Sequence, residues 1–248
     1  MNDEFYIGYL PKAPPETGRF TRNVVIALGL GALGMAALLA MTLPYFGTGE
    51  FAFGQPRDFT GTIRCEMAPR LSADGTDYLL VGDGKNRVAP EICGATGSEV
   101  TLRGTLIQRD GRQLIEVTTP PQVGAAGPAD TVPIPLGKFT LTGEIVDSKC
   151  YFGVMNPAEG RLHRACAVLC LKGGVPAVFV ARDRSGAAIH LLITGPEGQP
   201  MNEMLLRWVG ESVEATGEVV RQGQWLVLRL DPAALQFVRV LNTDRARS

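Results

Sequence analysis

The chain of 248 residues has little of the chemistry on which most hydrolases depend, because it contains only two histidines. Hydrolytic mechanisms that use an imidazole base therefore have few candidates. The acidic residues are scattered over turns, so no pair of carboxylates is indicated. Neither a glycine-rich phosphate-binding loop nor a dinucleotide-binding fingerprint occurs. A non-enzymatic protein is therefore expected more than an enzyme.

An excess of charge of either sign is also missing. The 24 basic and 25 acidic residues give a formal net charge of -1. No basic stripe with interleaved aromatic residues is present, so a nucleic-acid partner is not predicted. Heptad repeats and low-complexity tracts are absent as well.

One long uncharged segment is present, at residues 24–46. It is long enough to cross the hydrocarbon core of a membrane as a single helix. Arg19 and Arg22 precede it, so the positive-inside rule places the N-terminus in the cytoplasm and the bulk of the chain in the periplasm of a bacterial inner membrane. The alternative is a cleaved signal peptide with a cleavage site at 52–54, although the apolar run is long for one.

The anchor and the segment before it predict membrane partners. Ala32, Ala36 and Ala40 repeat every four residues, a spacing that lets helices pack closely in lipid. The cytoplasmic tail, residues 1–23, carries three aromatic residues within positions 5–9. We expect docking to other membrane subunits; the alternatives are the ordinary abundance of alanine in such helices and an interfacial aromatic anchor.

The rest of the chain has all-β patterning, with short alternating apolar runs between Gly, Asp and Asn turns. We predict a mainly β protein with two tandem OB-like small barrels, at 56–119 and 138–242, the second with an inserted helix. A Pro-, Gly- and Ala-rich stretch at 120–137 is interpreted as the linker between them. A β-sandwich is the alternative fold.

The two units resemble each other in sequence. Residues 97–117 align without gaps to residues 210–230, and Gly104 then coincides with Gly217. A glycine inside a long strand lets the strand bend at a barrel corner. A Phe-Thr pair opens each unit, at 59–60 and 139–140. An internal duplication is therefore predicted.

Three of the five cysteines and one histidine fall in a single short segment. His163, Cys166 and Cys170 have helical spacing, on a helix predicted at 161–172, while Cys150 lies at the end of the preceding strand. Three thiolates and an imidazole suit zinc, copper(I) or an iron–sulfur cluster. The segment therefore predicts one bound metal or cluster, although a site without any metal is an equal alternative.

The competing interpretation of the cysteines is structural. The periplasm is oxidising, so a Cys65–Cys93 disulfide is expected within the first unit. An odd number of cysteines remains, which allows a disulfide among Cys150, Cys166 and Cys170 plus one free thiol. A redox-active Cys166–Cys170 dithiol is a third possibility, but such pairs usually have two intervening residues.

The surroundings of these cysteines support either interpretation. Asp147 is a candidate hydrogen-bond partner that would orient His163 as a metal ligand. Tyr151 and Phe152 would shield a site or simply pack, and His190, within a predicted strand, is expected to be structural. In the structural interpretation the buried stripe of the helix consists of Leu162, Cys166, Leu169 and Cys170. Gly173-Gly174 is predicted to end that helix, and a second short helix is predicted at 200–208.

The strand and helix together resemble a pattern of small bacterial exported domains. That pattern reads G-x-V-x-D-x-x-C followed by H-x-x-C-A-x-x-C. The matching residues are Gly143, Asp147, Cys150, His163, Cys166, Ala167 and Cys170. The resemblance implies an OB-fold-like domain outside the cytoplasm and implies no particular activity.

Two functions from different classes are expected from these observations. The first is a membrane-anchored, non-catalytic subunit or assembly factor of a membrane redox or respiratory complex. The second is a metal-handling or electron-transfer protein that uses Cys150, His163, Cys166 and Cys170 as ligands.

Overall fold

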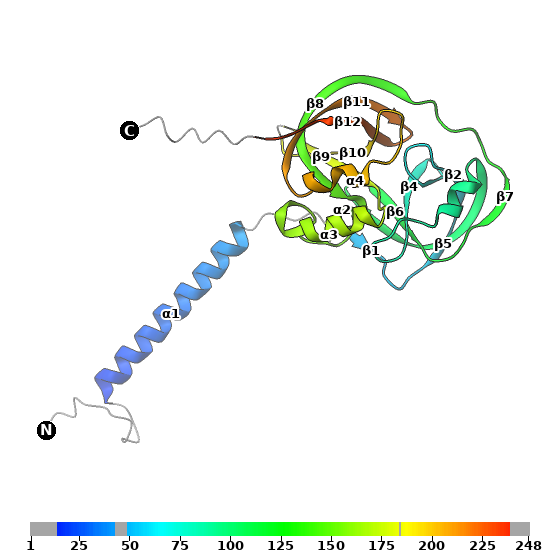
Figure 1. Cartoon of the computed structure of the whole chain (residues 1–248). Helices are drawn as coiled ribbons and strands as arrows, with labels where there is room; N and C mark the ends of the chain where they lie inside the picture. Colours follow the sequence, from blue (N-terminus) through cyan, green and yellow to red (C-terminus); the bar gives the residue numbers. More distant parts are fainter. Residues whose placement is uncertain (1–13, 43–48, 184, 239–248) are drawn as a thin grey trace, which may run out of the picture. The chain divides into compact units, whose positions relative to one another are not determined.

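The computed structural model describes residues 14–42, 49–183 and 185–238 (Figure 1). The chain divides into two units, 1–46 and 47–248, which are described separately. In the first unit, helix α1 (Pro15–Thr42) begins with a proline, whose fixed φ suits the first helical position. It therefore starts earlier than the span predicted at 24–46. The aromatic residues predicted to dock lie outside the described residues.

Helix α1 is long and apolar enough to cross a membrane over Pro15–Met41, with a mean hydropathy of 2.4 in its most apolar window. Its large apolar side chains are exposed, among them Leu28, Leu30 and Leu33.

The second unit begins with a closed five-stranded barrel, called barrel 1. Its strands are β2 (Arg57–Arg64), β3 (Arg70–Ala73), β4 (Thr76–Val81), β5 (Ser98–Arg109) and β6 (Arg112–Val117). Strand β5 pairs with both β2 and β6, and a parallel β4–β6 pairing closes the barrel. The short 3-10 helix η1 (Pro90–Ala95) connects β4 to β5, and β1 (Glu50–Phe51) pairs with the end of β5.

A second closed barrel, called barrel 2, follows with the same strand order. Its strands are β8 (Ile134–Asp147), β9 (Ala177–Arg182), β10 (Ala188–Thr194), β11 (Ser212–Gln222) and β12 (Trp225–Phe237). A parallel β10–β12 pairing closes it, as β4–β6 does in barrel 1. Its helices are α2 (Ser148–Phe152), α3 (Gly160–Lys172), α4 (Asn202–Leu205) and the 3-10 helix η2 (Leu206–Trp208). The prediction of a mainly β protein with two barrels and an N-terminal apolar helix is confirmed.

The segment predicted as a linker, 120–137, is partly regular structure. Strand β7 (Gln122–Ala126) lies within it and pairs with β5, and β8 already begins at Ile134. Unpaired backbone groups at the side of a strand accept another strand. A composition rich in Pro, Gly and Ala does not reveal such a pairing, because the partner lies elsewhere in the sequence.

The matched glycines Gly104 and Gly217 occupy equivalent places in β5 and β11. A Cβ at Gly104 would lie 2.6 Å from the carbonyl oxygen of Glu116, and one at Gly217 would lie 2.5 Å from that of Arg229. Both strands therefore approach their neighbour too closely for a side chain. The two positions agree with the predicted duplication.

The strand register corrects one detail of that duplication. Gly61 pairs with Val100, and Gly143 pairs with Val213, its counterpart in the aligned segments. Gly61 therefore corresponds to Gly143, and the match of the two Phe-Thr pairs is shifted by two residues. A two-residue shift keeps every side chain on its face of the strand, so alternation alone does not detect it.

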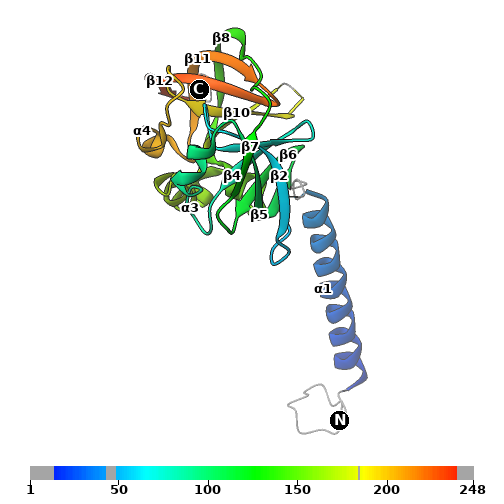
Figure 2. The same cartoon turned by 90° about the vertical axis from the view of Figure 1, so that its right-hand side faces the viewer.

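A shared apolar core joins the two barrels, which lie side by side (Figures 1 and 2). Each barrel has its own cluster of buried side chains, and a third cluster takes residues from both. Ile107 and Leu114 of barrel 1 belong to this third cluster with Phe152 and Trp225 of barrel 2. The Arg112 guanidinium lies 4.9 Å from the centre of the Trp225 ring at the same boundary. The described residues between 49 and 238 thus form one compact unit.

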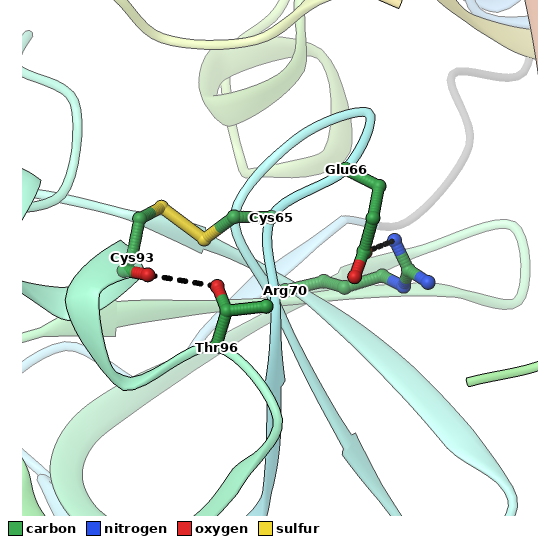
Figure 3. Close-up of a disulfide and its surroundings, with 5 residues drawn as sticks. All are labelled: Cys65, Glu66, Arg70, Cys93 and Thr96. Carbon is green, nitrogen blue, oxygen red and sulfur yellow. Dashed lines mark hydrogen bonds and ion pairs between the residues drawn. A yellow bond between two sulfur atoms is a disulfide. The ribbon is translucent and has the colours of Figure 1, made fainter. Parts of the chain in front are cut away.

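The predicted disulfide is present in barrel 1 (Figure 3). Cys65, which follows β2, is bonded to Cys93 in η1. The Thr96 hydroxyl donates a hydrogen bond of 2.8 Å to the Cys93 carbonyl at the end of η1. The disulfide therefore fixes the connection between β4 and β5 to the end of β2.

Removal of this disulfide is expected to destabilise barrel 1. The bonded cysteines are 28 residues apart, and closing a loop of this length stabilises the folded state by about 3–4 kcal/mol in the chain-entropy model. The Cys65→Ser, Cys93→Ser double variant should lose this free energy of unfolding in urea titrations. An unchanged midpoint and slope would show that the disulfide does not constrain the unfolded chain.

Candidate metal centre

Asp147 organises the start of the cysteine-containing segment. It is the last residue of β8 and the N-cap of α2, and its side chain is fully buried. Its Oδ1 accepts a hydrogen bond of 2.8 Å from the Cys150 backbone amide. This cap turns the chain from strand into helix, so Cys150 lies on α2 and not at the strand end as the sequence suggested.

Asp147 also holds the second helix of the site. The buried His163 imidazole, on α3, donates from Nε2 to Asp147 Oδ2 across 3.1 Å. The carboxylate only accepts, so it fixes which ring nitrogen carries the proton. The sequence-based pairing of Asp147 with His163 is therefore present in the structure.

The two helices bring three sulfur atoms together, at what we call the three-cysteine site (Cys150, Cys166 and Cys170). The Cys150 Sγ lies 3.8 Å from the Cys166 Sγ and 3.9 Å from the Cys170 Sγ, and all three atoms lie within 4.8 Å of one another. All three cysteines are free, so the structure contains no disulfide among them.

His163 does not join the three sulfurs. The second group of possible ligands consists of Asp147, Cys150 and His163, also within 4.8 Å of one another. Cys150 is common to both groups. The predicted four-residue ligand set is therefore divided into three sulfurs and an adjoining Asp–His pair, because the imidazole faces the capping carboxylate.

A lysine from barrel 1 reaches the site. Lys85, in the loop between β4 and η1, places its Nζ 2.6 Å from the Cys166 Sγ and 3.9 Å from the Cys170 Sγ. Hydrogen bonding to Cys166 raises the pKa of the Lys85 ammonium. The lysine is distant in sequence from all three cysteines, and nothing in the sequence around it indicates this role.

The surroundings of Cys150 and Cys170 shift the pKa values of these two thiols in opposite directions. The hydrogen bond with Cys170, followed by burial and the Asp147 carboxylate, raises the pKa of the Cys150 thiol. The same hydrogen bond lowers the pKa of the Cys170 thiol. The charge of the nearby Lys85 also lowers the pKa of Cys170, because a cation favours the thiolate form.

A second lysine, which is buried, joins the site to barrel 1. Lys149 precedes Cys150 and donates to the carbonyl oxygens of Gly82 and Gly84, at 2.6 Å and 2.7 Å. Its ammonium also forms an ion pair with Glu116 of β6, and both side chains are almost completely buried. A buried charge requires such a partner, so Lys149 fixes α2 against barrel 1.

The helix face predicted to be buried is wrong in two positions. Leu162 and Leu169 are 89% and 54% exposed, whereas Cys170 of the predicted stripe is buried. The face that contacts the barrel carries His163, Ala167, Cys170 and Leu171. The buried face thus includes the polar His163, which a hydrophobicity pattern assigns to solvent, and its ring is hydrogen-bonded to Asp147. The helix bounds, in contrast, agree within one residue, and Gly174 takes the left-handed conformation after the Gly173 cap.

The aromatic residues after Cys150 pack into the shared core. The Tyr151 and Phe152 rings both contact His190 edge to face, with ring centres 5.4 Å and 5.1 Å away. Tyr151 Oη lies 3.4 Å from His190 Nε2. These contacts agree with a structural role for His190, and they pack α2 against β10.

Comparison of the chain with protein-family models, curated proteins and solved structures finds no match. We therefore infer the chemistry of the three-cysteine site from its geometry.

His190 is expected to make the stability depend on pH. Burial, with a smaller effect of Arg112, lowers its pKa to about 4, whereas an unfolded histidine has a pKa of about 6.5. The unfolded chain therefore binds the proton more tightly, and the free energy of unfolding contributed by His190 is complete above pH 6.5. It falls as the pH decreases from about 6.5 to 4.

The His190→Phe variant keeps an aromatic ring but does not titrate. Its unfolding free energy should vary less between pH 6.5 and 4, by at most about 1.4 kcal/mol per pH unit relative to the unchanged chain. Chemical denaturation at several pH values measures this slope. Parallel profiles for the two proteins would contradict the prediction.

Proposed function

We propose that this chain holds one soft metal ion at the three-cysteine site and acts in metal handling or electron transfer. The observation that carries the proposal is the clustering of three sulfur atoms, with separations of 3.8 Å and 3.9 Å from Cys150. A tetrahedral ion with metal–sulfur bonds of about 2.3 Å holds its sulfurs about 3.8 Å apart. Both separations from Cys150 match such an ion, and the third sulfur pair lies within 4.8 Å.

The donor set narrows the choice of metal. Thiolates favour copper(I) and zinc, whereas iron–sulfur clusters are most often held by four cysteines. The site offers three sulfurs, and His163 Nε2 is already bonded to Asp147. A single copper(I) or zinc ion suits this set better than a cluster. Copper(I) would supply one-electron chemistry, and zinc would not.

The position of the site in barrel 2 supports binding. Both barrels place their strands in the order first, second, third, fifth, fourth, with the third and fifth parallel. This is the order of an OB-like barrel, a fold that often uses the connection between its first two strands for ligands. Helices α2 and α3 lie in that connection of barrel 2.

We further propose that α1 anchors the protein in a bacterial inner membrane, with the barrels in the periplasm. An exposed apolar helix of this length supports an anchor, and the Cys65–Cys93 disulfide suits an oxidising compartment. A non-catalytic subunit or assembly factor of a membrane redox complex is the second candidate function. The exposed face of small residues at Ala32, Ala36 and Ala40 favours this second function, because such a face suits close packing against another membrane helix.

Metal content tests the first proposal directly. The full chain, purified in mild detergent without chelators, should carry one ion per chain by native mass spectrometry. The Cys166→Ser, Cys170→Ser variant should lose it, because two of three ligands are gone. Leu169→Ser is a matched control, since it adds a hydroxyl on the exposed side of α3 between these residues.

Two outcomes would contradict the metal proposal. One is full metal retention in the double-serine variant. The other is a metal-free protein with a single reactive thiol, which would instead establish a disulfide among the three cysteines.

Reporter fusions test the orientation of the anchor. Alkaline phosphatase fused after residue 248 should be active, because it folds only outside the cytoplasm, and green fluorescent protein at the same place should remain dark. Exchange of Arg19 and Arg22 for glutamate should reduce phosphatase activity by weakening the positive-inside signal. Activity of the fusion in the soluble periplasmic fraction would indicate a cleaved leader instead of an anchor.

A further inference from the structure

We propose that barrel 1 regulates the three-cysteine site of barrel 2, through a positioning loop at residues 82–87. The loop closes over the site and places Lys85 on Cys166, and thereby sets how tightly a metal ion is held. This inference rests on the metal function proposed above, but one of its measurements does not require metal.

The loop is a compact turn with its own hydrogen bonds. The Gly82 amide donates to the Asn86 carbonyl across 3.0 Å, and the Asn86 amide donates to the Asp83 carbonyl across 3.2 Å. Gly84 has a φ of 60°, which favours glycine at the tip of the turn. Such a closed turn moves as one body, so displacing one side of it displaces Lys85.

The first anchor of the loop lies beside Cys150. Lys149 donates to the carbonyls of Gly82 and Gly84 and is paired with Glu116 of barrel 1. Since Lys149 and Cys150 are adjacent on α2, the loop and the first sulfur are held by the same short helix.

The second anchor lies just beyond Cys170. The Arg87 amide donates to the Gly173 carbonyl across 2.7 Å. The backbones approach so closely that a Cβ at Gly173 would lie 1.8 Å from the Lys85 carbonyl oxygen. The loop is therefore held on both sides of the site, by residues that do not themselves bear a sulfur atom.

Lys85 is the contact between this loop and the sulfurs. Its Nζ lies 2.6 Å from the Cys166 Sγ, and Cys166 is the half-exposed member of α3 at the site. Coupling between two sites is reciprocal, so a loop that strengthens metal binding is itself held more firmly when metal is bound. Barrel 1 thus provides a control element for ligands that all belong to barrel 2.

A pair of glycine substitutions tests the proposal in the full-length protein. Gly173→Ala should push the loop away without removing any side chain, and the φ of -70° at Gly173 permits alanine. Gly94→Ala is the matched control, because a Cβ there has no atom within 4 Å. Zinc affinity, measured by chelator competition, should fall at least about 5-fold in Gly173→Ala and remain unchanged in Gly94→Ala.

Lys85→Met shows whether the loop acts through its lysine. Lys85→Met should weaken zinc binding as Gly173→Ala does, and the double variant should be no weaker than either single one. Lys85→Arg, which keeps the charge, should recover part of the affinity. Additive losses in the double variant would overturn the role given to Lys85.

Hydrogen exchange without metal separates this inference from the metal proposal. Amides of α3 should exchange faster in Gly173→Ala than in Gly94→Ala, even if the unchanged chain binds no zinc. If exchange is faster but the unchanged chain binds no zinc, the metal function and its regulation are both wrong, and the contact between the loop and α3 is confirmed. Equal zinc affinity and equal exchange in both glycine variants would overturn the inference itself.

Discussion

The apolar core shared by the two barrels is the constraint on which the rest of the structure depends. Trp225 and Phe152 of barrel 2 are buried together with Ile107 and Leu114 of barrel 1. Either barrel alone would therefore expose apolar side chains to solvent. Burial of apolar area is non-directional, and it fixes only that the barrels meet. Their relative orientation is fixed by polar groups at the boundary, above all the buried Lys149, which requires Glu116 and two loop carbonyls at defined positions.

The candidate metal centre is a product of that orientation. Barrel 2 supplies the three sulfurs, on two helices joined by the Asp147 cap and its hydrogen bond to His163. Barrel 1 supplies the lysine beside Cys166. The two barrels share one strand order but contribute differently to this centre, because, within the described residues, only barrel 2 carries helices with cysteines in the connection between its first two strands.

Much of this arrangement follows from local sequence patterns, and the exceptions have physical reasons. The helix carrying Cys166 and Cys170 was predicted within one residue, because its spacing and its double-glycine end are local signals. Its buried face was wrong at Leu162 and Leu169, because the helix turns His163, Ala167, Cys170 and Leu171 to the barrel, and the partners of these side chains lie on other elements. The match of the two Phe-Thr pairs was shifted by two residues, which alternation with a period of two does not detect.

The sequence by itself determined the class of the elements, the apolar helix, the Cys65–Cys93 pair and the concentration of sulfur around α3, because each depends on residues close together or on a simple count. Only the tertiary structure decided that three sulfurs meet while His163 turns to Asp147. It alone also brings Lys85 to Cys166 from 81 positions away. Such contacts depend on how elements that are far apart in the sequence pack together, which no local pattern encodes.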